Sequence, residues 1–374
     1  MEQYTEYELG AICSRLSSGK GISAKNITDE GEYPVYGGNG LRGYTGTCNF
    51  DGDCAIIGRQ GAFCGNVRYF NGQAYMTEHA VVCCANEEHN TRYLAYLLST
   101  MNLGRLSGQS AQPGLSVKTL SKQIVQMPSL GQQKKVASVL STLDAKIASN
   151  EKINDNLQQQ AYAYFLRLFV ENADPSWRVG TIADLGTVVG GGTPSKAKQE
   201  YYTEDGIAWI TPKDLSIDKS KFIAHGENDI SELGYQSSSA TMMPAGTVLF
   251  SSRAPIGYIA IASNEVTTNQ GFKSVVPHPE IGTPFVYYFL IHNLPLIESK
   301  ASGSTFKEVS GSVMKSVEAV IPDGDALAKF DDFCRPVFEM QRKLEQENRK
   351  LAAMRDSLLP RLMSGEIDVA DVEV

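Results

Sequence analysis

The feature that most constrains this 374-residue sequence is an internal repeat, in which positions about 194 residues apart match along two long segments. A nearly constant offset over a hundred residues indicates a duplicated unit. The sequence therefore predicts two related globular domains, each followed by a similar second segment. The matching pairs include Arg59 with Arg253, Tyr96 with Tyr288, Ser116 with Ser310, Leu120 with Met314, Pro128 with Pro322, Asn154 with Asn348, Leu157 with Leu351 and Arg167 with Arg361.

Each repeat has two parts of different character. The first part contains short runs rich in Gly, Tyr, Val and Ile, such as 54–63 and 247–262, which are typical of strands joined by turns. One helix is expected near 90–101, and its counterpart near 283–297. The second part of each repeat has the period of a long helix.

The two long helices are expected to pair. The first helix carries a stripe at 4,3 spacing without Gly or Pro between 132 and 173, and a stripe this narrow favours one partner helix. If the second helix runs back antiparallel to the first, the molecule gains a pseudo-twofold axis and a spacer of roughly 60 Å. The predicted stripes are Val136, Leu140, Leu143, Ile147, Asn150, Asn154, Leu157, Ala161, Tyr164 and Leu168, and Phe330, Phe333, Val337, Met340, Leu344, Leu351, Met354 and Leu358.

The predicted fold class is α+β: two similar mixed α/β domains separated by a long antiparallel two-helix coiled coil. The expected boundaries are 1–130 for the first domain, 131–172 for the first long helix, 173–325 for the second domain, and 326–374 for the second long helix with a C-terminal tail. Two similar heads at a fixed separation suit an extended target with two parts. Duplex DNA is such a polymer.

Charge argues against strong nonspecific binding to DNA by this chain alone. The formal net charge is −8, and no segment forms a polybasic patch. A partner is therefore expected to supply much of the grip on phosphate. The seven cysteines include no CxxC pair, which favours free thiols in a cytoplasmic protein, and the acidic N-terminus lacks the blocks of a signal peptide.

Several motifs together resemble the specificity subunits of type I restriction–modification enzymes. Segments 33–46, 56–67 and 77–82 resemble the first target-recognition domain of that family, and segments 190–196, 210–215, 250–257 and 267–275 resemble the second. Segment 130–147 is similar to the helical region that joins the domains, and 355–367 to the family's closing segment. The motifs occur in the family's order and span essentially the whole chain.

The resemblance implies a noncatalytic subunit that reads a split, asymmetric DNA sequence, one half with each domain. It implies two methylation subunits docked along the helices, which bind S-adenosylmethionine themselves and methylate adenine, and ATP-dependent restriction subunits joining that assembly. No cofactor or metal is expected on this chain. The resemblance also implies that an N-terminal extension of some relatives is missing, because the first domain begins close to Met1.

Polar loop residues are the expected base readers, because Arg pairs with guanine and Asn or Gln with adenine in the major groove. For any single residue, a solvated surface side chain is the alternative. The candidates are Asn39, Arg42, Arg59, Gln60, Arg68, Gln109, Ser110 and Gln112 in the first domain, and Thr193, Ser195, Lys196, Lys213, Arg253, Asn269, Gln270, Ser304, Thr305 and Lys307 in the second.

Arg59 and Arg253 are singled out because the repeat places both in equivalent loops after a strand. Either could instead pair with a carboxylate inside its own domain. Polar residues off the helical stripe are expected to face the methylation subunits or solvent. These are Gln133, Lys134, Glu151, Lys152, Arg342, Lys343 and Glu345.

Enzyme motifs are weak in this sequence. Residues 38–43 satisfy GxGxxG, but turn and strand residues follow them instead of a helix, which favours a glycine-rich loop at the DNA face or a plain turn over a dinucleotide site. Residues 190–196 lack the GxxxxGK[ST] pattern of a phosphate-binding loop. Two alternatives stay open: a self-contained DNA methyltransferase with a duplicated recognition domain, and a noncatalytic rod-and-head protein that binds a protein or a glycan.

Overall fold

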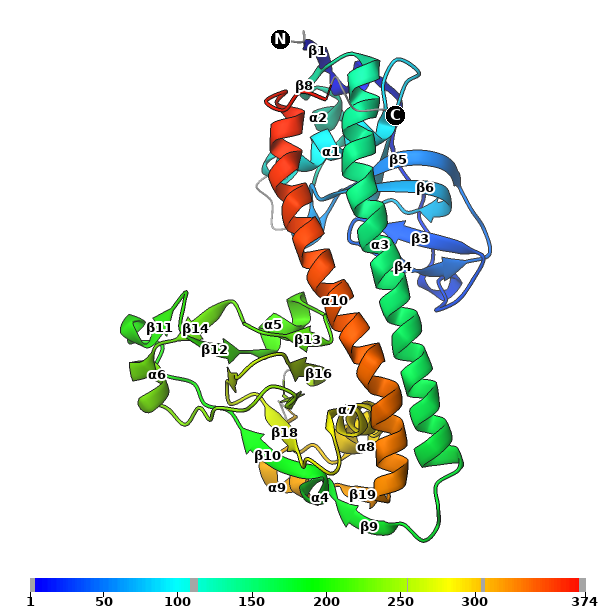
Figure 1. Cartoon of the computed structure of the whole chain (residues 1–374). Helices are drawn as coiled ribbons and strands as arrows, with labels where there is room; N and C mark the ends of the chain where they lie inside the picture. Colours follow the sequence, from blue (N-terminus) through cyan, green and yellow to red (C-terminus); the bar gives the residue numbers. More distant parts are fainter. Residues whose placement is uncertain (1–3, 108–113, 254, 304–306, 370–374) are drawn as a thin grey trace. The chain divides into compact units, whose positions relative to one another are not determined.

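The computed structural model describes residues 4–107, 114–253, 255–303 and 307–369, and it divides into two compact units. The first unit comprises Met1–Ile147 and Lys350–Val374, and the second comprises Ala148–Arg349. Two long helices, α3 (Leu130–Leu166) and α10 (Gly324–Met363), each contribute residues to both units (Figure 1). Each unit therefore combines a globular part with a segment of each long helix.

A six-stranded sheet forms the centre of the first unit, in the order β2-β7-β5-β6-β3-β4. Helix α1 (Thr91–Thr100) packs on β5 and β6, and a short pair of strands, β1 with β8, stands apart from the sheet. The strands are β1 (Thr5–Glu8), β2 (Cys13–Ser18), β3 (Tyr33–Gly37), β4 (Gly40–Thr45), β5 (Phe50–Gly58), β6 (Val67–Met76), β7 (Ala80–Ala85) and β8 (Ile124–Met127). Helix α2 (Val117–Ser121) precedes β8.

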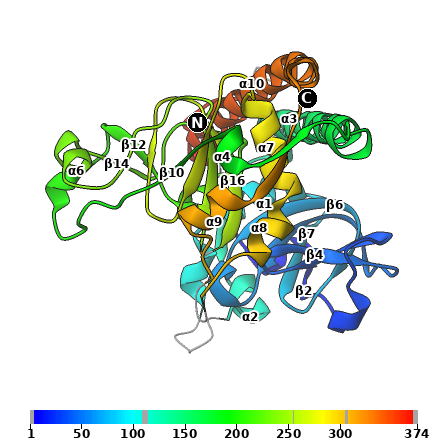
Figure 2. The ribbon, with the colours of Figure 1, turned by 90° about the horizontal axis from the view of Figure 1, so that it is seen from below.

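The second unit contains a five-stranded sheet, β10-β18-β15-β16-β13, and a four-stranded sheet, β11-β14-β12-β17. Helices α7 (Thr283–His292) and α8 (Leu294–Ser299) lie next to β16 (Figure 2). The strands are β9 (Arg178–Thr181), β10 (Gly186–Gly190), β11 (Tyr202–Thr203), β12 (Ile207–Ile210), β13 (Phe222–Ile223), β14 (Asn228–Ile230), β15 (Val248–Ser252), β16 (Ile256–Ala262), β17 (Thr267–Thr268), β18 (Lys273–Pro277) and β19 (Glu318–Ile321). The remaining helices are α4 (Ile182–Leu185), α5 (Pro212–Ile217), α6 (Glu232–Gln236) and α9 (Gly311–Ser316).

The two units share a topology, as the repeat predicts. Strands β2-β7-β5-β6 of the first unit correspond in order and connection to β10-β18-β15-β16 of the second, and the β1–β8 pair corresponds to β9–β19. Helices α1 and α7 occupy equivalent places in the repeat. The helix expected near 90–101 is α1, whereas the single helix expected near 283–297 is divided at Asn293 into α7 and α8. The four-stranded sheet β11-β14-β12-β17 has no counterpart among the described strands of the first unit, and here the two units differ.

Segments of α3 and α10 contact each other within each unit. In the second unit, the ring of Tyr164 lies 4.7 Å from that of Phe333, Gln341 Nε2 donates to the carbonyl of Asn154 at 3.2 Å, and Asn150 Nδ2 donates to Asn348 Oδ1 at 2.8 Å. Residue numbers fall along one helix as they rise along the other, so these segments run antiparallel.

The expected stripe is correct on α3 and partly wrong on α10. Every predicted stripe residue of α3 is buried or half-buried. On α10, however, the side chains of Phe333, Met340 and Met354 are exposed, whereas Cys334 and Gln341 are buried. The buried face of α10 is displaced by about one residue because the helix packs against its globular domain as well as against α3.

Candidate nucleic-acid interface

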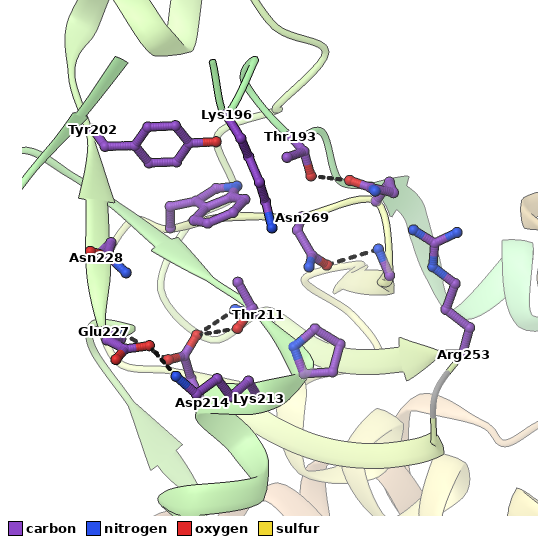
Figure 3. Close-up of a pocket in the computed structure, with 14 residues that line it drawn as sticks. Thr193, Lys196, Tyr202, Thr211, Lys213, Asp214, Glu227, Asn228, Arg253 and Asn269 are labelled. Carbon is purple, nitrogen blue, oxygen red and sulfur yellow. Dashed lines mark hydrogen bonds and ion pairs between the residues drawn. The ribbon is translucent and has the colours of Figure 1, made fainter. Parts of the chain in front are cut away.

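A pocket of 660 Å³ in the second unit collects most of the base readers predicted there. Its walls come from the loop after β10, the start of α5, the loop after β15 and the loop after β17, so residues distant in sequence surround one hollow (Figure 3). The predicted residues that line it are Thr193, Lys196, Lys213, Arg253, Asn269 and Gln270. Donors and acceptors of the types that read base edges therefore converge at one place.

Close backbone packing explains two glycines of the loop after β10, Gly191 and Gly192. A Cβ built on Gly191 would lie 2.0 Å from the carbonyl oxygen of Asn269, and one on Gly192 would lie 2.3 Å from the amide nitrogen of Ala240. The loop after β10 thus lies directly on the loop after β17. Thr193 and Gln270 are joined across the two loops by a side-chain hydrogen bond.

Acidic groups balance part of the positive charge in the pocket. The Lys213 Nζ lies 2.5 Å from Glu227 Oε2, and this hydrogen bond raises the pKa of Lys213. Asp214 is buried and structural: its carboxylate accepts from the backbone amide of Thr211 at 2.7 Å and from that of Glu227 at 2.9 Å. Of the three cationic side chains described at the pocket, Lys213 and Arg253 have carboxylate partners, and Lys196 has no ion pair among the described residues.

Arg253 both lines the pocket and pairs with a carboxylate. Its Nη1 lies 3.7 Å from Glu308 Oε2, and Lys273 Nζ lies 3.5 Å from the other oxygen of the same carboxylate. The arginine side chain is 37% exposed, so the guanidinium keeps a face toward solvent. Arg253 thus pairs with a carboxylate of its own domain, which was the alternative to a DNA contact, and it also lines the pocket where a DNA contact is expected.

The candidates of the first unit gather around the β3–β4 turn. Asn39 is exposed at the tip of the turn, a Cβ on Gly40 would lie 2.5 Å from Arg68 Nη1, and one on Gly37 would lie 2.8 Å from Arg42 Cδ. The side chains of Arg42, in β4, and of Arg68, in β6, therefore lie against this turn. Residues 38–43 form the β3–β4 turn and the start of β4, so the GxGxxG pattern lacks the helix that follows it in a dinucleotide site.

Arg59 and Arg253 occupy equivalent places. Each directly follows a central strand, β5 or β15, and each region is bridged to a loop from later in the repeat: Gln60 pairs with Gly114, and Arg253 with Glu308. Unlike Arg253, Arg59 has a hydroxyl as its partner, with Nη1 donating to Ser18 Oγ at 3.4 Å.

The remaining candidates lie outside these groups. Ser195 is exposed in the loop between two pocket residues, and Lys307 is exposed beside Glu308, but neither lines the pocket. Gln109, Ser110, Gln112, Ser304 and Thr305 lie outside the described residues.

The pocket residues that sequence reasoning missed include Tyr202, Trp209, Glu227 and Asn228. The rings of Tyr202 and Trp209 meet edge to face at 5.7 Å, and Trp209 Nε1 donates to the carbonyl of Gly192 at 2.9 Å. Tyr202, Trp209 and Asn228 lie in β11, β12 and β14, which have no counterpart among the described strands of the first unit, and Glu227 directly precedes β14. The repeat therefore gave no signal for these residues.

Two polar residues expected to face partners instead hold the globular domains. Gln133 is fully buried, where its Oε1 accepts from the amide of Asn90 and its Nε2 donates to the carbonyl of Pro128, both at 2.8 Å. The carboxylate of Glu345 accepts from the backbone amides of Lys221 and Phe222. Both residues were predicted as exposed because they lie off the apolar stripe.

Neither a bilayer span nor a metal site is found in the parts of the chain that the structure describes. There, no helix is both long and apolar enough to cross a bilayer. Likewise, no three His, Cys, Asp or Glu side chains gather into a group that could hold a metal ion.

Known proteins share this architecture. The chain is 38% identical over 185 residues to the type I restriction enzyme MjaIX specificity subunit of Methanocaldococcus jannaschii, an alignment that covers 47% of this chain and 42% of that one. It is 24% identical over 298 residues to the EcoR124I/EcoR124II specificity subunit of Escherichia coli, covering 74% and 72% of the two chains. Thus the chain spans less than half the length of the first relative.

The fold matches as well. A crystal structure of a type I restriction–modification system S subunit from M. genitalium superposes with a TM-score of 0.64 and 17% sequence identity, over 96% of both chains. The family model described as type I restriction modification DNA specificity domain matches residues 1–159 and 175–339, once for each repeat. The chain therefore belongs to the family of type I restriction modification DNA specificity domains.

Proposed function

We propose that this chain is the noncatalytic DNA sequence-specificity subunit of a type I restriction–modification complex in the cytoplasm. Each unit reads one half of a split target, and the target is asymmetric because the two units present different side chains. The observation that carries the proposal is the convergence of Arg, Lys, Asn and Gln side chains on one pocket of the second unit, from three loops and the start of α5, in a chain that belongs to a family of DNA specificity domains.

The proposal includes domains with the boundaries 1–130 and 173–325, joined by the helices 131–172 and 326–374 as an antiparallel coiled coil with pseudo-twofold symmetry. The contacts of Asn150 and Gln341 support the pairing. A buried amide pair in a helical seam favours one register over others.

The helices are proposed to dock two methylation subunits, which carry S-adenosylmethionine and methylate adenine, and ATP-dependent restriction subunits complete the complex. Exposed apolar side chains on α3 and α10 support a protein-docking role. Ile153, Phe333, Met340 and Met354 are between 37% and 52% exposed, so both helices offer apolar side chains that a partner could cover.

The base readers are proposed to be the candidate residues of both units, led by Arg253 in the pocket and by Arg42, Arg59 and Arg68 near the β3–β4 turn. The net charge of −8 and the ion pair of Lys213 with Glu227 leave this chain few free cations for phosphate, which supports separate roles for the chain and its partners. The specificity subunit contacts the base edges, and the partner subunits contact the phosphate backbone.

The test is the methylome of cells that express this chain together with a type I methylation subunit. A split motif with adenine methylated on both strands is the expected result, and the Arg253→Ala variant should relax one half of that motif. A matched variant, Arg59→Ala, should relax the other half. Loss of both halves in either variant would contradict the model of two readers, and DNA methylation by the chain alone would favour the self-contained methyltransferase.

A further inference from the structure

Lys221 is a lysine buried among aromatic rings, at the edge of the five-stranded sheet of the second unit. Its side chain is 7% exposed, and its Nζ lies 4.2 Å from the ring centre of Phe338, 4.8 Å from that of Tyr287 and 5.3 Å from that of Tyr288. The Nζ also donates to Gln341 Oε1 at 2.6 Å and to Tyr288 Oη at 3.2 Å. Rings and acceptors together hold the ammonium group in one position.

This cage joins the sheet to both long helices. Tyr288 Oη, from α7, donates to Gln158 Oε1 of α3 at 3.0 Å, and the Gln341 amide, from α10, donates to the Asn154 carbonyl of α3. The backbone is fixed beside the side chain, because the Glu345 carboxylate accepts from the amides of Lys221 and Phe222 at 2.8 and 3.1 Å. Lys221 is thus the point where the edge of the sheet, α7, α10 and α3 meet.

A buried lysine is costly for a purely structural role. Burial lowers the pKa of Lys221 to about 7, and an apolar side chain of similar volume would fill the site without that cost. Directional hydrogen bonds differ from apolar packing in that they favour one geometry over neighbouring ones. The hydrogen bonds of Lys221 can offset the free-energy cost of its burial by favouring one angle between the sheet and the helices.

A path of paired strands leads from the cage to the pocket. Lys221 immediately precedes β13, which pairs with β16; β16 pairs with β15, and Arg253 directly follows β15. A shift of the sheet edge on the helices would thereby displace Arg253 and the wall of the pocket that it forms. Base reading by bidentate contacts tolerates only small displacements.

We infer that Lys221 and Tyr288 are positioning residues, which set the angle of the second recognition domain on its helices and so the base discrimination of that half. This inference rests on the proposed function. Different contacts join the globular domain to the helices at the equivalent place of the first unit, so the two units can be compared.

In the first unit, Tyr96 takes the place of Tyr288 in the repeat. Its hydroxyl bonds to the Asp144 carboxylate of α3, and Arg355 Nη1 of α10 lies 3.0 Å from the other oxygen of that carboxylate. A tyrosine of the globular domain therefore contacts a network that includes both helices in each unit. The chemistry differs: a carboxylate and a guanidinium in the first unit, an ammonium and amides in the second.

The experiment compares Tyr288→Phe with Tyr96→Phe, which remove a single hydroxyl from equivalent positions. Each variant is assembled with the methylation subunits, and methylation is measured on the duplex motif defined by the methylome and on duplexes with one base changed in either half. Tyr288→Phe, which loses the bonds of the hydroxyl to Lys221 and Gln158, should reduce discrimination about tenfold in the second half only. Tyr96→Phe, which loses the bond to Asp144, should reduce it in the first half only. The turnover on the intact motif should stay unchanged.

Lys221→Met tests the ammonium group, and Lys221→Arg is the conservative control that keeps its charge. The methionine variant should lose discrimination in the second half, and the arginine variant should regain at least part of it. Hydrogen exchange at the amides of Lys221 and Phe222 is the readout without DNA, and it should quicken in Lys221→Met.

Relaxation of both halves together, or unchanged discrimination alongside faster exchange, would overturn the inference. If the wild-type complex methylates no split motif, the proposed function fails instead. The exchange measurement would still show whether Lys221 holds the edge of the sheet, so the two failures are distinguishable.

Discussion

The stability of the second unit should depend on pH through Lys221, and the Lys221→Met variant should remove that dependence. Burial lowers the pKa of this ammonium group from its ordinary value of 10.5 to about 7 in the folded state. Between these two values the unfolded chain binds a proton that the folded chain has lost. The free energy of unfolding therefore rises with pH from about 7 upward.

The magnitude follows from the two pKa values. A full proton of difference changes the free energy of unfolding by about 1.4 kcal/mol per pH unit. At pH 7 the folded lysine is half protonated, so the gain from pH 7 to pH 8.5 is about 1.6 kcal/mol. Methionine does not titrate, and cysteines that ionise in this range contribute to both proteins and largely cancel in the difference.

Urea unfolding followed by tryptophan fluorescence is a suitable assay, because both tryptophans of the chain, Trp177 and Trp209, belong to the second unit. Midpoints and slopes are measured for both proteins at several values between pH 7 and 8.5. Relative to Lys221→Met, the wild type should gain stability steadily over this range. Parallel pH profiles would refute the argument, because they would mean that the folded lysine keeps an ordinary pKa.

Three further predictions concern other parts of the chain. Arg253→Ala should weaken binding of the target duplex, measured by fluorescence anisotropy, by about 1–3 kcal/mol, while thermal stability changes by less than about 1 kcal/mol because the pair with Glu308 is partly exposed; a large loss of stability would mark the arginine as structural. Phe165→Ala should lower the free energy of unfolding of the second unit by about 3–5 kcal/mol in urea titrations, because this ring is 2% exposed among aromatic neighbours, and a loss below about 1 kcal/mol would contradict that packing. Cys48, which is exposed, should react with a thiol reagent such as DTNB before Cys334, whose pKa burial raises to about 12, and equal rates would contradict the described burial.

The repeat made much of the second pocket predictable. Arg253 could be found because Arg59 stands at the same position of the first repeat. The polar residues around 193–196 and 269–270 could be found because they lie in segments that resemble the second recognition domain of the family. Trp209 and Glu227 could not be found in this way. They lie in or beside strands present in the second unit alone, so no internal comparison marks them.

Periodicity identified a buried stripe on α3 but missed buried residues outside it, such as Gln133 and Phe165, and it placed part of the stripe on α10 wrongly. A 4,3 pattern identifies the face that packs on one partner helix, whereas α10 also packs against its globular domain, which draws Cys334 and Gln341 inward and leaves Met340 exposed. Polar residues on such a second face, including Gln133 and Glu345, look solvated in sequence. Their burial depends on partners that lie far away along the chain.

The joints that hold the two globular domains show what a diverged repeat preserves and what it changes. Tyr96 and Tyr288 keep the same place, but one meets Asp144 and the other meets Gln158 and Lys221. Each domain is therefore matched to helix residues that would not suit the other: a domain with the Lys221 cage placed on Asp144 and Arg355 would lose its hydrogen bonds to the amides of Gln158 and Gln341 and bring a second cation beside the Arg355 guanidinium. A recognition domain exchanged between relatives should consequently fold and discriminate well only when the helix residues opposite its tyrosine are exchanged with it.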